Sequence, residues 1–282
     1  MTAVVGGLLA AACFTTTILA STRASRMIGA LPTLAGVMLF GLVLALPIAA
    51  LTIGDTRPTP AQLPYLLIAG VGNVLGLGSQ YIAVRTGKVG VVGALAAAEG
   101  AIAAVLSVMA GERLGPVEGV GVAVVGIGVI LAALGRDPDG GDPGAAARAV
   151  LFGGLAGLAF GASLYATGRI GADLAAGWAI LPPRVVGMTL IVIPLVATRR
   201  LRISRSAAPF IALAGAGEVG GFLAVAWGAT ESIAITSALA AQFATLAALI
   251  AWLVLGERLG RVQWIGIGAV AIGVVLLAVG AT

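Results

Sequence analysis

The sequence predicts an all-α membrane protein with ten transmembrane helices, arranged as two inverted five-helix repeats. Three observations lead to this prediction. Of the 282 residues, 60% are hydrophobic and only 10% are charged, whereas soluble domains carry about 25% charged residues. Ten stretches are apolar over a length that suits a bilayer span. Finally, the second half of the chain repeats the first.

The ten apolar stretches follow one another along the whole chain. A bilayer span needs roughly 20 apolar residues. The predicted spans are 3–21, 31–53, 63–84, 89–110, 116–135, 149–168, 174–197, 207–227, 232–254 and 261–280. The connections are mostly short and polar. The longest, 136–148, contains two prolines among aspartates and glycines and is the only segment with the composition of a linker. We therefore expect a first five-helix repeat at 1–135 and a second at 149–282.

The repeat is read at an offset of 145 residues. Gly111-Glu112-Arg113-Leu114-Gly115 recurs as Gly256-Glu257-Arg258-Leu259-Gly260, and about half of the positions in 111–135 are identical to those in 256–280. Because five is odd, a second copy that crosses the bilayer fully must be inverted relative to the first. Inverted repeats about an axis in the membrane plane are an architecture of transporters. The alternative is a duplication that only enlarges a structural membrane protein.

The residue inventory excludes several classes of function. The chain has one cysteine, Cys13, and no histidine, so a disulfide framework, a His or multi-cysteine metal site and Ser-His-Asp catalysis are excluded. A P-loop and a GxSxG motif are also missing. The basic residues are spread among short loops, which argues against nucleic-acid binding despite a formal charge of +5. We expect no enzyme activity, no metal and no cofactor.

The repeated motif resembles a known family. Val108-Met109-Ala110-Gly111-Glu112-Arg113-Leu114 and Leu253-Val254-Leu255-Gly256-Glu257-Arg258-Leu259, each followed by a glycine-rich helix, are similar to the EamA-type branch of the drug/metabolite transporter superfamily. The resemblance covers essentially the whole chain and implies ten helices, inverted repeats and a central cavity. The family's fourth-helix Glu-Pro resembles Glu99-Gly100, but the proline is missing. Its members export amino acids, other metabolites or toxic compounds.

The predicted function is therefore secondary transport in the inner (plasma) membrane. We expect export of small metabolites, such as amino acids or related solutes, by alternating access. Coupling to protons and uniport both remain open, as do a passive facilitator or channel and a multidrug exporter. Few aromatic residues are expected at the cavity, which weighs against large planar drugs. The expected partners are a small-molecule substrate, the lipid bilayer and, in the coupled case, protons; the sequence also leaves a homodimer open.

The distribution of basic residues predicts an orientation. Twelve of the 16 Lys and Arg residues lie in the loops after the odd-numbered predicted spans. The positive-inside rule places those loops in the cytoplasm and both termini outside. The family resemblance implies cytoplasmic termini instead.

Polar residues at membrane depth are the candidate sites, because their burial in lipid is costly. The candidates for binding substrate or ions are Glu218, Glu99, Arg184, Asn73, Gln80, Tyr81 and Gln242. Either glutamate could bind a proton or a cationic substrate. The structural alternative is that Glu218 pairs with Arg184, or bonds to Asn73 or Gln80, to fix helix register.

Arg184 follows Pro182-Pro183, which we expect to break the seventh span or to mark its start. Arg184 could clamp a substrate carboxylate or phosphate, or reach to a lipid headgroup if the helix starts there. At the ends of the fourth and ninth spans, Glu112, Arg113, Glu257 and Arg258 predict a structural or gating ion pair. The GxxxG pairs Gly72/Gly76 and Gly217/Gly221 predict close helix packing.

Overall fold

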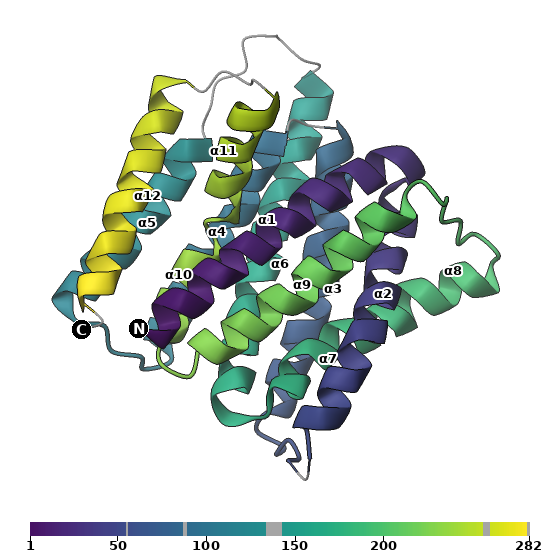
Figure 1. Cartoon of the computed structure of the whole chain (residues 1–282), viewed down its shortest axis with the longest axis horizontal. Helices are drawn as coiled ribbons and strands as arrows, with labels where there is room; N and C mark the ends of the chain where they lie inside the picture. The colour runs from purple at the N-terminus through teal and green to yellow at the C-terminus, as the bar shows by residue number, and fades with distance from the viewer. Residues whose placement is uncertain (55, 87–88, 134–142, 256–259, 281–282) are drawn as a thin grey trace.

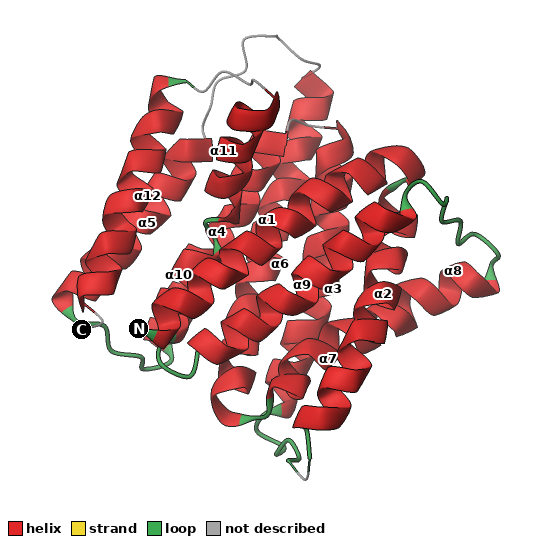
Figure 2. Ribbon diagram, in the orientation of Figure 1, coloured by secondary structure: helices red, strands yellow, loops and turns green. Residues whose placement is uncertain are grey.

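The protein is a bundle of helices. The computed structural model describes residues 1–54, 56–86, 89–133, 143–255 and 260–280, and no strand is found among them (Figure 2). The elements in chain order are α1 Thr2–Ile28, α2 Ala30–Thr52, α3 Leu63–Thr86, α4 Val89–Met109, α5 Pro116–Ala133, α6 Pro143–Asp173, α7 Ala176–Gly187, the π-helix η1 Met188–Val192, α8 Ile193–Ala197, α9 Ala208–Gly228, α10 Ile233–Ala240, α11 Phe243–Leu255 and α12 Arg261–Gly280.

Six stretches of helix are long and apolar enough to cross a membrane. They are Thr2–Ile28, Ala30–Thr52, Leu63–Arg85, Ala147–Asp173, Ala176–Ala197 and Ala208–Gly228. Shorter apolar helices cover Ala98–Met109, Pro116–Gly128, Ile233–Ala247 and Trp264–Leu277. The prediction of a helical membrane protein is thus confirmed, and the shorter helices fall in the last two predicted spans of each half.

Helix boundaries differ from the predicted spans at several places. Residues 143–148, predicted as the end of the linker, lie in α6, while 136–142 lie outside the described residues. The ninth predicted span is interrupted, since α10 ends at Ala240 and α11 begins at Phe243. The apolar pattern alone cannot reveal such an interruption, because the two pieces are equally apolar.

Pro182 and Pro183 lie inside α7. The expectation that they break this helix or mark its start is wrong. A proline removes the N–H that would bond to the carbonyl four residues earlier, but membrane helices tolerate this where neighbouring helices pack around the site. Here α3 packs against it, because a Cβ added to Gly70 would lie 2.8 Å from the Pro182 carbonyl oxygen.

Equivalent positions of the two halves make equivalent contacts. α1 packs mainly on α9, and α3 packs mainly on α6. The Thr17 hydroxyl of α1 donates to the Ala214 carbonyl of α9 at 3.1 Å, and the Ser163 hydroxyl of α6 donates to the Ala69 carbonyl of α3 at 2.8 Å. Ala69 and Ala214 are 145 residues apart, so they are repeat mates. The two halves therefore hold each other through matching hydrogen bonds.

α5 and α12 lie side by side at one edge of the bundle (Figure 1). A Cβ on Gly128 would lie 2.7 Å from the Val270 nitrogen, and one on Gly273 would lie 2.9 Å from the Val125 nitrogen. These two contacts exchange repeat mates, because 128 pairs with 273 and 125 with 270. Glycine is required at both places for the backbones to approach this closely.

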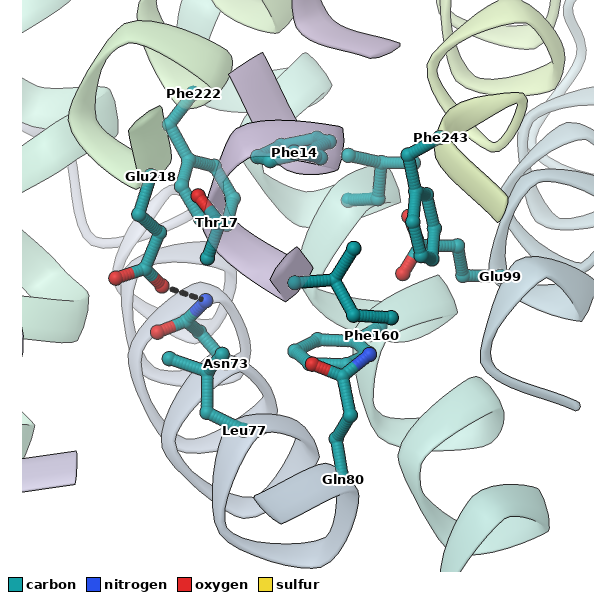
Figure 3. A pocket seen from close by; sticks show the side chains of 12 residues that line it. Phe14, Thr17, Asn73, Leu77, Gln80, Glu99, Phe160, Glu218, Phe222 and Phe243 are labelled. Carbon is teal, nitrogen blue, oxygen red and sulfur yellow. Dashed lines mark hydrogen bonds between the residues drawn. The ribbon is translucent and has the colours of Figure 1, made fainter. Parts of the chain in front are cut away.

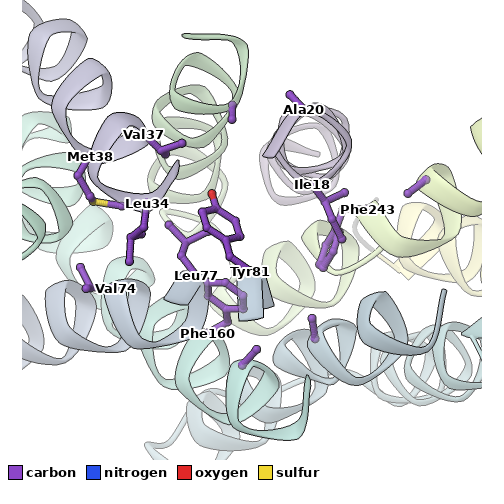
Figure 4. Close-up of a cluster of buried hydrophobic side chains, with 14 of the residues drawn as sticks. Ile18, Ala20, Leu34, Val37, Met38, Val74, Leu77, Tyr81, Phe160 and Phe243 are labelled. Carbon is purple, nitrogen blue, oxygen red and sulfur yellow. The ribbon is translucent and has the colours of Figure 1, made fainter. Parts of the chain in front are cut away.

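The main hydrophobic core lies where helices of both halves meet (Figure 4). It includes Ile18, Leu34, Met38, Leu77, Tyr81, Phe160, Leu239 and Phe243. Because these side chains come from α1, α2, α3, α6, α10 and α11, the core ties the first half to the second, and it lies directly against the cavity described next.

Candidate functional site

A narrow cavity lies at the centre of the bundle between the two halves (Figure 3). Its lining residues are Phe14, Thr17, Ile18, Asn73, Leu77, Gln80, Glu99, Phe160, Leu164, Glu218, Phe222 and Phe243. They come from α1, α3 and α4 in the first half and from α6, α9 and α11 in the second. The space open to the centres of water molecules is about 40 Å³, which is enough for a few waters or a small chemical group.

The walls of the cavity depend on two glycines. A Cβ added to Gly76 of α3 would clash with the Phe160 ring of α6, and one added to Gly221 of α9 would clash with the Phe14 ring of α1. Gly76 and Gly221 are repeat mates. The close packing predicted for these GxxxG faces is confirmed, and it also lets one phenylalanine ring from each half reach the cavity.

Glu218 is held in a buried polar cluster on one side of the cavity. Asn73 Nδ2 donates to Glu218 Oε1 at 2.8 Å, and Arg184 Nη1 donates to Glu218 Oε2 at 3.2 Å. Glu218 is 2% exposed and Arg184 is fully buried. Both carboxylate oxygens thus have a partner, and the charge of the carboxylate is balanced by a guanidinium. These are two of the partners that the structural alternative names for Glu218.

Arg184 lies behind Glu218 and is not among the residues that line the cavity. Its guanidinium packs against α2, where a Cβ on Gly41 would lie 2.7 Å from Nε. Arg184 Nε and Nη2 have no hydrogen-bond partner among the described residues. The idea that Arg184 reaches a headgroup from a helix start is wrong, because its side chain is fully buried. Its hydrogen bond within the described residues is the one to Glu218.

Glu99 stands on the opposite side of the cavity, beyond the ring of Phe243 (Figure 3). It is only 5% exposed. In the described part of the chain, its carboxylate has no ion pair and no hydrogen bond. A buried carboxyl group without a partner is costly to ionise, so it favours uptake of a proton or binding of a cation.

Residues 1–134 match the model of the EamA-like transporter family. These residues, just under half of the chain, are therefore similar to members of that family. The sequence resemblance to the drug/metabolite transporter superfamily is thereby confirmed, and it indicates a membrane transporter of the drug/metabolite kind.

The fold comparison extends over nearly the whole chain. One crystal structure superposes with a TM-score of 0.76 at 14% sequence identity, covering 99% of this chain and 96% of that chain. The likeness shows that the two chains share the same overall fold, including the second half of this chain. No curated protein sequence matches the chain.

The remaining candidates divide into those that line the central cavity and those that do not. Asn73 and Gln80 line it. Tyr81 and Gln242 are buried, at 0% and 5% exposed, but neither is among the lining residues. Whether a polar residue faces a cavity depends on how its helix is rotated against its neighbours, which the sequence does not specify.

The sequence missed the aromatic lining. Four phenylalanines line the cavity: Phe14, Phe160, Phe222 and Phe243. The expectation of few aromatic residues there is therefore wrong. A usable signal exists in the sequence, because Phe14 and Phe160 occupy matching places in the first helix of each repeat, opposite the matching glycines.

The first copy of the repeated Gly-Glu-Arg motif follows the end of α4 and contacts the start of α10. Gly111 has a φ of 101°, a conformation that favours glycine. The next residue, Glu112, accepts a hydrogen bond from the Ser232 hydroxyl at 2.5 Å and from the Ala234 N–H at 3.2 Å. Glu112 therefore caps α10 of the other half, whereas Arg113 is exposed. Glu257 and Arg258, predicted to act in the same way, lie outside the described residues.

Proposed function

We propose that this protein is a secondary transporter of the inner (plasma) membrane. It exports a small solute by alternating access, and Glu99 is the cavity group that exchanges a proton or an ammonium-bearing substrate. One observation carries the proposal. A hollow between the two halves holds two buried carboxylates, of which Glu218 is already neutralised and Glu99 has no partner among the described residues.

Alternating access needs two halves that can move against each other about the cavity. We propose ten spans in two inverted five-helix repeats, 1–135 and 149–282, joined by 136–148. The packing of α5 on α12 supports this arrangement, because Gly121 lies against Leu277 whereas Gly128 lies against Gly266 and Val270. Repeat mates that run antiparallel and exchange contacts are related by a two-fold axis across the helices.

The lining favours a particular kind of solute. Four phenylalanine rings offer an apolar surface, and Glu99 offers a negative charge. An ammonium group is attracted both to a carboxylate and to the faces of aromatic rings. Asn73 is engaged by Glu218, but Thr17 and Gln80 remain as polar neighbours in the lining. The chemistry of this lining favours a small amine with an apolar part, such as a hydrophobic amino acid, in a state of the transporter with a wider cavity.

Competition between the solute and a proton at one carboxylate gives the coupling. When Glu99 is protonated, its charge is removed and the ammonium group loses its partner. When the solute leaves, the buried carboxyl takes up a proton, because ionisation without a counter-ion is unfavourable in the membrane interior. Glu218 does not take part in this exchange, since Arg184 compensates its charge in both steps.

The proposal is tested in liposomes that contain a pH-sensitive dye. Wild-type protein is expected to move protons in response to hydrophobic amino acids from a solute panel. Glu99→Gln should remove the solute-driven proton signal, and Asp173→Asn, at an exposed carboxylate outside the cavity, should leave it unchanged. A Glu99→Gln protein that still moves protons with solute would exclude Glu99 from coupling. Wild-type protein that moves no solute of the panel at all would argue against transport of this class.

A further inference from the structure

A second and larger hollow lies at the end of the bundle where α4 and α6 end and α10 begins. Its lining residues are Ser107, Ala110, Gly111, Glu112, Tyr165, Arg169, Ala172, Ala229, Glu231, Ser232 and Ile233. About 300 Å³ is open to the centres of water molecules. Ala110, Gly111, Ala172 and Glu231 are exposed, so this vestibule opens to the outside of the bundle.

Two of the three charged residues that line the vestibule already accept hydrogen bonds. Glu112 accepts hydrogen bonds from Ser232 and Ala234. Glu231 accepts one from the Met1 ammonium group at 2.7 Å and one from the Ala3 N–H at 2.9 Å. The ammonium hydrogen bond lowers the pKa of the Glu231 carboxyl. Neither carboxylate therefore needs a ligand.

Arg169 is the charged residue left without an ionic partner. Its Nε is buried and has no hydrogen-bond partner among the described residues, and no ion pair involves it there. The guanidinium carbon lies 5.7 Å from the centre of the Tyr65 ring, and Tyr65 packs edge-on against Tyr165 with ring centres 6.1 Å apart. The two tyrosines thus hold the guanidinium at the wall of the vestibule while its donors remain available.

We propose that the vestibule is a second solute site, in which Arg169 binds the carboxylate of a small solute. The site is separate from the central cavity but adjoins it along α6, because Leu164 lines the cavity and Tyr165 lines the vestibule. Guanidinium groups bind carboxylates strongly through paired hydrogen bonds. A solute that carries both an ammonium and a carboxylate group would meet Glu99 in the cavity and Arg169 on its way in or out.

The test measures the charge preference of the vestibule and does not require transport, so its failure is distinct from failure of the proposed function. In a Cys13→Ala background, Ala110→Cys places a thiol in the vestibule and Ala61→Cys places one at an exposed turn between α2 and α3. Each thiol is reacted with a sulfonate-bearing and a trimethylammonium-bearing methanethiosulfonate. At residue 110 the ratio of anionic to cationic labelling should exceed the ratio in the Arg169→Gln protein by about tenfold, because the guanidinium acts oppositely on the two reagents whereas the Glu112 carboxylate is present in both proteins.

Arg169→Gln should lower the ratio at residue 110 but not at residue 61, and Arg169→Lys should preserve most of the preference. An unchanged midpoint of thermal unfolding in detergent shows that each variant is folded. Acetate and glycine, but not ethylamine, should slow labelling at residue 110 in the protein that retains Arg169. A ratio at residue 110 that Arg169→Gln leaves unchanged, or equal protection by ethylamine, would overturn the proposal. Protection by anionic lipid vesicles without any added solute would also overturn it, by assigning the site to a headgroup.

Discussion

The two carboxylates of the central cavity occupy opposite environments. Glu218 has a partner for each oxygen, one from α3 and one from α7. Glu99 is equally buried but has neither kind of partner among the described residues. A buried carboxylate is stable as an ion beside a guanidinium, but it is not stable without a counter-charge. The two residues should therefore respond differently to substitution by glutamine.

The difference follows from how the two repeats have diverged. The repeat mate of Glu218 is Asn73, and the two are joined by a hydrogen bond across the pseudo-equivalent helices α3 and α9. The repeat mate of Glu99 is Ala244, which can supply no polar group. The fold is thus built from matching contacts, whereas the chemistry of the cavity arises at positions where the halves no longer match.

The largest effect should come from removing the counter-charge of Glu218. Arg184→Met is expected to lower the free energy of unfolding by about 3–5 kcal/mol, because it leaves a buried carboxylate uncompensated. The double variant Arg184→Met with Glu218→Gln should recover much of the loss. Thermal unfolding in detergent measures both, with the exposed Arg113→Met as control. A single variant as stable as the wild type would show that Glu218 is not ionised in the fold.

The matching phenylalanine and glycine contacts test the symmetric part of the cavity. Gly76→Ala and Gly221→Ala should each destabilise by about 1–3 kcal/mol, because the added methyl group clashes with the ring of Phe160 or Phe14. Gly119→Ala is the control, since an added Cβ there meets no atom within 4 Å. Thermal unfolding of all three, measured together, should give two similar losses and no loss for the control. A loss at only one of the two mates would mean that the halves are packed differently.

A smaller effect is expected from the matching hydrogen bonds between helices. Thr17→Val and Ser163→Ala should each cost about 1 kcal/mol, because each removes a buried hydrogen bond between two helices. Thr16→Val serves as control, as its hydroxyl bonds only within α1, to the Ala12 carbonyl. Unfolding in detergent checks this series. Equal stability of Thr17→Val and Thr16→Val would show that the bond to Ala214 contributes nothing.

Features that depend on local composition were predictable. Apolar length predicted helices at every proposed span, and the repeated motif was correctly placed at the end of the fourth span, where α4 ends at Met109. The sequence also named both partners that hold Glu218. These results follow because hydropathy and backbone conformation are set by the residue itself or by its near neighbours.

Features that depend on contacts between helices were not predictable. The interruption after Ala240, the continuation of α7 through Pro182-Pro183 and the phenylalanine lining all depend on what packs against each helix. Tyr81 and Gln242 illustrate the same limit, because a small rotation of a helix decides whether a buried polar group lies on the cavity. At these positions the sequence determines which chemical group is present but not whether the side chain points into the cavity.

The smallest expected effect distinguishes the two carboxylates most directly. Glu99→Gln replaces a buried carboxyl that has no observed partner and is protonated in the absence of solute, so the free energy of unfolding at neutral pH should change by less than about 1 kcal/mol. Glu218→Gln instead leaves the buried guanidinium of Arg184 uncompensated and should cost about 3–5 kcal/mol. Thermal unfolding of the two variants side by side measures the contrast. If both lose the same stability, Glu99 must have a counter-charge of its own, and a carboxylate so compensated could not serve as the exchanging group of the cavity.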